Sequence, residues 1–467
     1  MEPSAPRFTP PRVVPPAKSL GPLAFVAAFV RNPLRVLPLA AYEEDFVAFG
    51  GSKSPRAWIT SPALIKGVLL DERDKFRKLT QIRLLGPLLG KGILTSEGAD
   101  WKWQRQAAAP MFRPQELAGF VPTFVRAAED TLARWRAQPQ GSVHAIDDDM
   151  SRATFDVIAA TLLPTANESF AIEVQRSVRA LQRFGGWGIL YASMNLPSWF
   201  PRPGMRSGTR AVQTLRSTIA AMVRKHRERN TGDGPDDLMR RLIAALDPET
   251  GRSMDDAQLV DNLLTFYLAG HETTAKALTW TLYLLARSAH WTQKLEEEIE
   301  RVTFGAALRA EHVEKLTGVQ QVLKESMRLY PPVPMMSRQA VADATIDGVS
   351  IRAGTSILMP IYAIHRHARR WQHPDEFDPE RFAPGNEGAI PRYQYMPFGA
   401  GPRVCIGMSF AMIEATAILA TLLRGARFEC VRGDEPTPVA RVTLLPKGGM
   451  PLKVSLSAAR ATRTSPR

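Results

Sequence analysis

Cys405 is the residue of this 467-residue chain best suited to metal or redox chemistry. It is one of only two cysteines and lies in a glycine-rich loop, Phe398–Gly407, directly before a stretch with helical spacing of apolar residues. Backbone N–H groups at a helix N-terminus and in a tight loop stabilise a negatively charged sulfur. Glycine lets the backbone approach a flat ligand closely. The loop therefore predicts a metal-ligating thiolate, and the alternative is a buried structural thiol.

The loop follows the pattern Phe-Gly-x-Gly-x-Arg-x-Cys-x-Gly, which resembles the haem-binding loop of the haem-thiolate monooxygenases, the cytochromes P450. A thiolate ligand pushes electron density from haem iron towards O–O cleavage. The resemblance is to a soluble, bacterial-type member, and it implies haem b (iron-protoporphyrin IX) as the cofactor. By the same resemblance Cys405 is the axial iron ligand, Arg403 pairs with a haem propionate, and Phe398 belongs to the cofactor-binding loop.

A second candidate for chemistry is the segment Ala-Gly-His-Glu-Thr-Thr at 269–274, in the centre of a helix predicted from Ser253 to about Arg287. Ser253 and Asp256 are the predicted cap of this helix. An acid and two hydroxyls inside an apolar helix are costly unless they are used. The structural alternative is a local kink, because threonine can bond to a carbonyl one turn earlier.

The same segment matches the family's Ala-Gly-x-(Asp/Glu)-Thr. The resemblance therefore implies that Glu272 and Thr273 are catalytic residues that relay protons to dioxygen. No second histidine lies four residues after His271, so the segment is not the His-Glu-x-x-His zinc motif.

Trp101 and Arg105 stand four residues apart at the start of a predicted helix and therefore share a face. From the residues alone they could form a surface cation–aromatic pair. The resemblance instead makes both of them ligands of the haem propionates. It assigns the same role to Arg338, which follows the apolar segment 333–336.

Glu325 and Arg328 lie three residues apart on one face of a helix that ends at Tyr-Pro-Pro. Arg381, in Asp-Pro-Glu-Arg-Phe, supplies a third partner for a buried and satisfied network. The family uses such a trio to lock the core behind the haem. We therefore expect a structural role for these three residues, without chemistry of their own.

By resemblance, the substrate pocket is lined almost wholly by apolar residues. The predicted members are Leu84, Leu88, Phe266, Ala269, Val333, Met335 and Met450. Residues 80–95 read as an apolar loop, and the segment Phe184–Phe200 reads as ordinary core or as an apolar lid. A pocket with few charged anchors predicts a lipophilic substrate such as a terpenoid, a fatty acid or a steroid-like molecule.

The sequence predicts a mainly α-helical protein with a small β-rich portion, the single-domain cytochrome P450 fold. Residues 1–40 are expected to form an irregular, proline-rich arm, residues 41–456 the haem domain, and residues 457–467 a basic, flexible tail. A tight hairpin is predicted around Asp347-Gly348.

The formal net charge of +14 suits an acidic protein partner, nucleic acid or a membrane surface. No helix-turn-helix, zinc-finger or RNA-platform pattern accompanies it, so no nucleic-acid partner is expected. The apolar run at 20–30 is interrupted by Pro22 and is too short to span a bilayer, so no transmembrane anchor is expected. Two cysteines fit a reducing compartment and predict a cytoplasmic protein.

Together these features predict a monooxygenase that activates dioxygen and hydroxylates or epoxidises a lipophilic small molecule. The chain carries no flavin or iron–sulfur signature, so electrons are expected from a ferredoxin-type partner with its reductase. The alternatives are a peroxygenase or isomerase on the same fold, a non-catalytic haem-based sensor, and a helical protein without haem.

Overall fold

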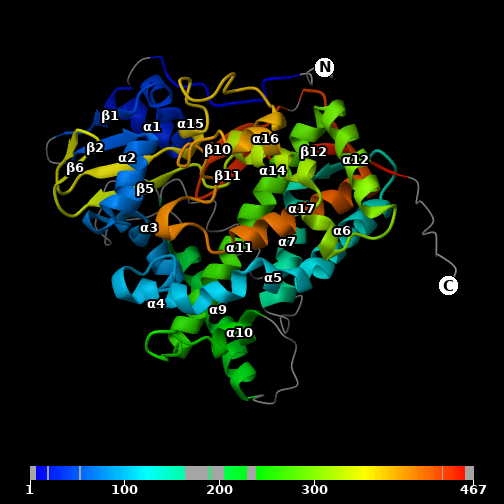
Figure 1. Cartoon of the computed structure of the whole chain (residues 1–467), viewed down its shortest axis with the longest axis horizontal. Helices are drawn as coiled ribbons and strands as arrows, with labels where there is room; N and C mark the ends of the chain where they lie inside the picture. Colours follow the sequence, from blue (N-terminus) through cyan, green and yellow to red (C-terminus); the bar gives the residue numbers. More distant parts are fainter. Residues whose placement is uncertain are drawn as a thin grey trace.

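A computed structural model describes residues 7–17, 20–51, 54–162, 188, 191, 205–228, 238–433 and 435–457. These residues form a mainly helical protein with its largest sheet gathered at one side, as predicted (Figure 1). The predicted lid at Phe184–Phe200 lies outside the described residues, apart from Gly188 and Tyr191. All of the predicted tail except Ser457 also lies outside them.

The described helices range from single turns to α11, which has 31 residues. The α-helices are α1 (Pro22–Arg31), α2 (Pro62–Lys66), α3 (Leu79–Leu89), α4 (Gly98–Ala108), α5 (Pro114–Leu117), α6 (Val121–Arg136), α7 (Ile146–Leu162), α9 (Met205–Glu228), α10 (Leu238–Ala244), α11 (Asp256–Ala286), α12 (Ala289–Thr303), α13 (Ala310–Val313), α14 (Thr317–Leu329), α15 (Ile361–Ile364), α16 (Pro384–Glu387) and α17 (Met408–Gly425).

The described strands are short. They are β1 (Phe46–Phe49), β2 (Arg56–Ile59), β3 (Phe76–Arg77), β4 (Val143–Ala145), β5 (Met336–Ala340), β6 (Ala344–Ile346), β7 (Val349–Ile351), β8 (Ser356–Met359), β9 (Ala426–Cys430), β10 (Thr437–Ala440), β11 (Leu444–Lys447) and β12 (Pro451–Leu456).

The largest sheet has the strand order β1-β2-β8-β5-β3, in which only the β2–β8 pair is parallel. The smaller sheets are β4-β12-β9 and the hairpins β6-β7 and β10-β11. The predicted hairpin is β6-β7, and its turn residues Asp347 (φ 49°) and Gly348 (φ 75°) adopt the left-handed conformation that a two-residue hairpin turn favours.

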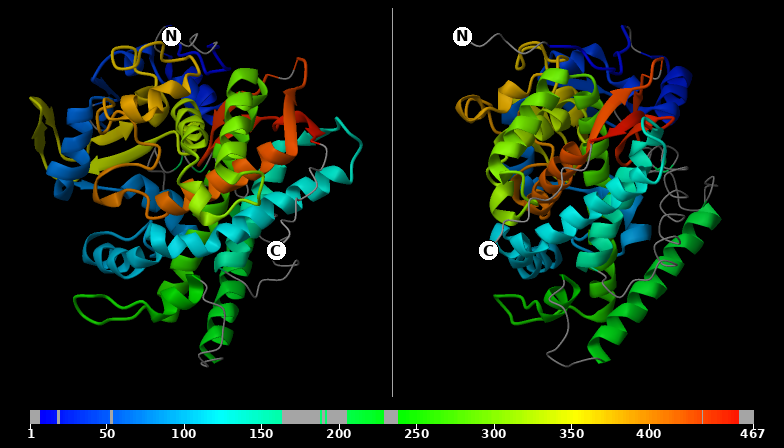
Figure 2. Two further views of the ribbon diagram at one scale, coloured as in Figure 1. Left: turned by 45° about the vertical axis from the view of Figure 1, so that its right-hand side comes forward. Right: turned by 90° about the vertical axis from the view of Figure 1, so that its right-hand side faces the viewer.

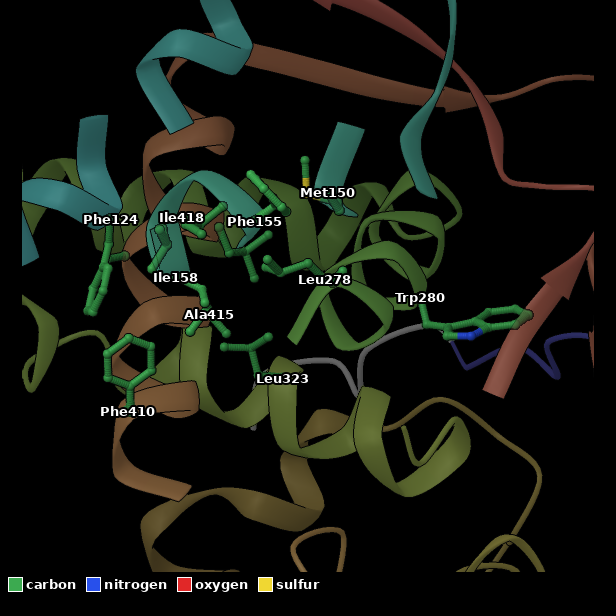
Figure 3. Close-up of a cluster of buried hydrophobic side chains, with 14 of the residues drawn as sticks. Phe124, Met150, Phe155, Ile158, Leu278, Trp280, Leu323, Phe410, Ala415 and Ile418 are labelled. Carbon is green, nitrogen blue, oxygen red and sulfur yellow. The ribbon is translucent and has the colours of Figure 1, made fainter. Parts of the chain in front are cut away.

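Helix α17, which follows the cysteine loop, runs through the middle of the helical part and packs against α6, α11, α12 and α14 (Figure 2). Buried side chains from five helices meet around it, among them Phe124, Ile158, Leu278, Leu323 and Ile418 (Figure 3). Helix α17 is the one helix of the described residues with the length and hydropathy to cross a membrane, and 61% of it is buried inside the molecule. Its apolar character is therefore explained by its place in the core.

The long helix predicted around the acid is α11, but its cap differs from the predicted one. The Asp255 carboxylate accepts the Gln258 N–H at 2.8 Å, and the Gln258 side chain accepts the Asp255 N–H at 3.2 Å. This reciprocal capping box satisfies two backbone donors at once, which explains why the helix begins after Asp255 and not at Ser253.

The prediction of an irregular N-terminal arm over residues 1–40 is wrong for most of residues 22–40. Helix α1 spans Pro22–Arg31, and two 3-10 helices follow at Pro33–Val36 and Leu39–Tyr42. Proline interrupts a helix only in its interior, and Pro22 occupies the first turn, where its missing N–H costs nothing. Residues 7–17 are irregular, as predicted.

The prediction of a loop over residues 80–95 is also wrong for residues 80–89. Helix α3 spans Leu79–Leu89 and contains Pro87 within its last turn. The helix ends at Gly90, whose φ of 60° suits glycine. The described chain is therefore helical over most of a segment that its apolar composition indicated to be a loop.

Glu325 and Arg328 of α14 come together with Arg381 of the 3-10 helix Pro379–Phe382, as predicted. The Arg328 Nε and Nη2 atoms donate to the two Glu325 carboxylate oxygens at 2.7 and 2.8 Å. Arg381 Nε lies 3.6 Å from Glu325 Oε1, which also accepts the Asp378 N–H at 2.8 Å. Arg328 donates further to the carbonyl oxygen of His365 at 2.9 Å. Glu325 and Arg328 are fully buried, and this degree of hydrogen bonding is what makes a buried ion pair tolerable.

Replacing Glu325 with alanine is expected to lower the free energy of unfolding by about 3–5 kcal/mol, because Arg328 would remain as a buried charge without its carboxylate. Chemical unfolding followed by circular dichroism measures the change. Asp71→Ala is the control, since the Lys66–Asp71 pair is half exposed and such pairs contribute about 0–1 kcal/mol. A loss no larger than that of the control would contradict the structural role of Glu325.

Candidate active site

A cavity of about 580 Å³ lies between the Cys405 loop, α11, α3, α4 and the largest sheet. Every residue predicted to bind the cofactor lines it, as do both predicted catalytic residues. These residues are Trp101, Arg105, Arg338, Phe398, Arg403, Cys405, Glu272 and Thr273. Four segments that are distant in sequence therefore converge on one cavity.

Cys405 is held by a loop whose backbone is determined by glycine. The Cys405 N–H donates to the Phe398 carbonyl oxygen at 2.9 Å, which closes the loop. Gly401 has a φ of 71°, and a Cβ there would lie 2.6 Å from the carbonyl oxygen of Leu69. Position 401 therefore requires glycine, both for its positive φ and for its close contact with Leu69.

The Cys405 side chain is accessible because it lines the cavity. Burial raises the pKa of its thiol, whereas the Gly407 N–H and the Arg105 guanidinium act in the opposite direction. Arg105 itself donates to the Val404 carbonyl oxygen at 2.8 Å. A metal ion bound by the sulfur would supply further positive charge and so stabilise the thiolate.

Four cationic side chains meet at the edge of the cavity near Trp101: Lys78, Arg105, Arg338 and Arg403. The Arg403 guanidinium lies 4.1 Å from the centre of the Trp101 ring. Burial, together with the charge of Arg403, lowers the pKa of Arg338 to about 10. Burial also lowers the pKa of Arg403 to about 10, against the attraction of Glu97.

Lys78 is buried in the same place, and no sequence pattern singled it out. Burial and the charges of Arg403 and Arg338 lower the pKa of Lys78 to about 7. Glu97 supplies a carboxylate beside these four cationic side chains, and one of its oxygens lies 3.0 Å from Arg403 Nη2. The positive charge here therefore exceeds the negative charge that the described residues supply.

Glu272 and Thr273 lie on α11, half buried, with both side chains at the cavity wall. The Thr273 hydroxyl donates to the Ala269 carbonyl oxygen one turn earlier, at 2.8 Å. The Thr443 hydroxyl donates to Glu272 Oε1 at 2.6 Å. Thr443 belongs to the turn between β10 and β11, and no local pattern singled it out.

His271, the neighbour of Glu272, faces away from the cavity. Its Nδ1 lies 3.0 Å from the Tyr267 carbonyl oxygen, and burial lowers the pKa of its imidazole. The Thr154 hydroxyl of α7 donates to the His271 carbonyl oxygen at 2.7 Å. This histidine therefore belongs to the α7–α11 contact.

Six of the seven predicted pocket residues line the cavity: Leu84, Leu88, Phe266, Ala269, Val333 and Met335. The seventh, Met450, does not, which corrects the prediction. Its N–H donates to Asp147 Oδ1 at 2.8 Å and its carbonyl oxygen accepts the Ile146 N–H at 3.0 Å, so this turn folds onto the start of α7. The turn 440–443 of the β10-β11 hairpin provides the wall instead.

Asp261 fixes the wall segment that follows α3. Its carboxylate accepts the Lys91 N–H at 2.7 Å and pairs with Arg216 of α9 at 2.5 Å. Its neighbour Asn262 accepts the Ile93 N–H at 2.8 Å. Since Ile93 lines the cavity, the first half of α11 determines the position of one cavity wall.

A family model described as Cytochrome P450 matches residues 33–453. This chain belongs to the cytochrome P450 family. Cytokinin hydroxylase from Arabidopsis thaliana is 32% identical over 423 residues, which cover 88% of this chain and 80% of that protein. Cyclooctat-9-en-7-ol 5-monooxygenase from Streptomyces melanosporofaciens is 31% identical over 413 residues, 88% of each chain. The solved haem domain of cytochrome P450DA has a TM-score of 0.84 and 25% identity, covering 96% of this chain and 98% of that one.

The chain is therefore a cytochrome P450 monooxygenase, which implies a haem cofactor, dioxygen and a redox partner. The residues present fit a haem. A thiol faces one side of the cavity, and a cluster with excess positive charge stands at its edge, where the two carboxylates of a haem would balance it. No group of three His, Cys, Asp or Glu side chains suited to a bare metal ion occurs among the described residues.

The depressed pKa of Lys78 should make the stability of the cofactor-free P450 depend on pH. Between about 7 and 10.5 the unfolded chain holds a proton on Lys78 that the folded chain lacks. Stability should therefore rise with pH in this range, by at most about 1.4 kcal/mol per pH unit from this group. Lys78→Met is expected to remove that rise.

Urea unfolding of the cofactor-free protein at several pH values from 7 to 9 measures the slope. Lys66→Met, at a half-exposed position, is the control and should keep the slope of the natural chain. Equal slopes in the two variants would contradict the assignment to Lys78.

Proposed function

We propose that this P450 hydroxylates or epoxidises a lipophilic small molecule with haem b as its cofactor. The observation that carries the proposal is the cavity itself, which combines the Cys405 thiol, a cationic edge and an acid–hydroxyl pair with apolar walls. In the overall reaction one oxygen atom of dioxygen enters the substrate, and the other leaves as water with two electrons and two protons.

Cys405 would hold the haem iron through its sulfur, with Phe398 beside it in the same loop. Trp101, Arg105, Arg338 and Arg403 would hold the propionates, and Lys78 stands close enough in the same cationic group to join them. When bound, the haem supplies the activation of dioxygen and the oxygen atom transfer. The protein residues orient the cofactor, keep the thiolate in place and limit the access of water.

Glu272 and Thr273 would move the protons. The Glu272 carboxylate stands at the cavity wall, where it can take a proton from solvent and release it inwards. The Thr273 hydroxyl can both donate and accept, and its bond to Ala269 keeps it directed along α11. An intact acid–hydroxyl pair favours a monooxygenase over a peroxygenase or an isomerase on the same fold.

The substrate proposed for this site is a terpenoid, a fatty acid or a steroid-like molecule. Leucine, phenylalanine and methionine side chains form most of the cavity wall away from the cationic edge. A ligand binds to such a wall by burying its apolar surface, so the wall selects ligands by shape and size more than by charge. The names of the Arabidopsis and Streptomyces relatives, a hydroxylase and a monooxygenase, support oxygen insertion as the reaction.

The electron donor proposed is a ferredoxin-type protein with its reductase, in the cytoplasm. The chain after the cysteine loop reaches the surface at Met408, which is 41% exposed, and the net charge of +14 suits an acidic partner. Charge reversals around Met408 that leave the electron-transfer rate unchanged would contradict this docking face.

Replacing Cys405 with serine should abolish incorporation of labelled oxygen into product, because a neutral hydroxyl cannot act as the thiolate ligand. The same variant should still bind haem through its cationic edge, with an altered Soret band. Mass spectrometry under ¹⁸O₂ and absorbance spectroscopy measure the two effects. Cys430→Ser is the control, since Cys430 lies on β9 and does not line the cavity. Oxygen incorporation by the Cys405 variant would overturn the proposed role.

The substrate class is tested by following the Soret band of the ferric protein during titration with limonene, hexadecanoic acid and progesterone. A ligand that enters the cavity and displaces iron-bound water should shift the band at micromolar concentration. A shift with one probe only selects that class. A haem spectrum that none of the three moves would contradict all three proposed classes and leave the family assignment intact.

A further inference from the structure

The hydrogen bond between Thr443 and Glu272 joins residues that are 171 positions apart. The donor–acceptor distance is 2.6 Å, as expected for a hydroxyl that donates to a carboxylate. Thr443 is 3% exposed, and Glu272 is half buried beside it at the cavity wall. The bond therefore connects the β10-β11 turn to the acid of α11 from inside the protein.

The β10-β11 hairpin is anchored at its outer side by the N-terminal segment. The Asn32 amide donates to the Pro438 carbonyl oxygen at 2.9 Å, and its oxygen accepts the Ala440 N–H at 3.1 Å. Asn32 is 4% exposed and also accepts the Leu34 N–H at 3.2 Å. One buried amide thus fixes the strand that leads into the turn.

The turn is also anchored at its inner side. The Arg441 N–H donates to the Thr443 carbonyl oxygen at 2.8 Å, which closes the bend. The Leu444 N–H donates to the Pro332 carbonyl oxygen at 2.9 Å, and the Trp280 indole N–H of α11 donates to the Leu444 carbonyl oxygen at 3.1 Å. With its backbone held on both sides of Thr443, the hydroxyl is presented from a rigid support.

We propose that Thr443 is a positioning residue that sets the orientation of the Glu272 carboxylate for proton delivery. A glutamate side chain on a helix has several rotamers, and a hydrogen bond from a fixed donor selects one of them. The inference rests on the proposed function, because it assumes that Glu272 supplies protons to the reaction.

The direct test is a pair of substitutions at position 443. Thr443→Val keeps the shape of the side chain and removes the hydroxyl, and Thr443→Ser keeps the hydroxyl. In the valine variant we expect the product formed per electron pair supplied to fall about threefold to tenfold, with the remainder released as hydrogen peroxide or excess water. The serine variant should stay near the natural value.

The assay uses the haem-loaded protein and whichever of limonene, hexadecanoic acid and progesterone shifts the Soret band. Thr437→Val is the matched control, because Thr437 is exposed on the same hairpin. Crystal structures of the variants give a readout that does not depend on turnover. The Glu272 carboxylate should leave its position in Thr443→Val and keep it in Thr443→Ser and Thr437→Val.

A Glu272→Gln variant separates the inference from the proposed function on which it rests. The quantity compared is the coupling, the product formed per electron pair supplied. If Glu272→Gln lowers the coupling while Thr443→Val keeps both the coupling and the carboxylate position, the role of Thr443 is overturned and that of Glu272 stands. If Glu272→Gln keeps natural coupling, proton delivery by Glu272 is overturned. If both lose coupling, the double variant should be no worse than Glu272→Gln alone, and an additive loss would show that Thr443 acts by another route.

Discussion

Uncompensated positive charge in the interior is the constraint on which the rest of the site depends. Lys78, Arg105, Arg338 and Arg403 share one edge of an otherwise apolar cavity, and burial lowers the pKa of each. Charges held in this way cost free energy in the chain alone, and an anionic cofactor offsets that cost. Binding of the haem is therefore coupled to the stability of the elements that bring these side chains together, which are α3, α4, β5 and the Cys405 loop.

Helix α11 supports the cavity at three points along its length. Asp261, near its start, holds the wall segment after α3, and Glu272, at its centre, reaches the cavity. At Gly270 a Cβ would lie 2.6 Å from Ile158 of α7, so the two helices touch where the acid follows. This close packing holds the helix in place where it lines the cavity, and with it the polar side chains of Glu272 and Thr273.

The sequence predicted the parts of the site that are local, because a few consecutive residues determine them. The Cys405 loop, the acid–hydroxyl pair and the β6-β7 turn lie as predicted. The sequence did not predict the roles of Lys78 and Thr443, because each role depends on residues that are distant in the chain. Helix α1 was not predicted because Pro22 was taken as an interruption, although proline is tolerated in the first turn of a helix. Helix α3 was not predicted because its apolar residues were taken for a loop.

The β10-β11 hairpin shows why long-range pairs matter for function. Its turn provides part of the cavity wall through Val442 and, one residue later, the hydroxyl that donates to Glu272. Both side chains stand on one short stretch of backbone, which the Leu444 N–H and carbonyl oxygen anchor to Pro332 and Trp280. One rigid turn thus contributes to the cavity wall and also holds the Glu272 carboxylate by a hydrogen bond, and neither contact can be read from the local sequence.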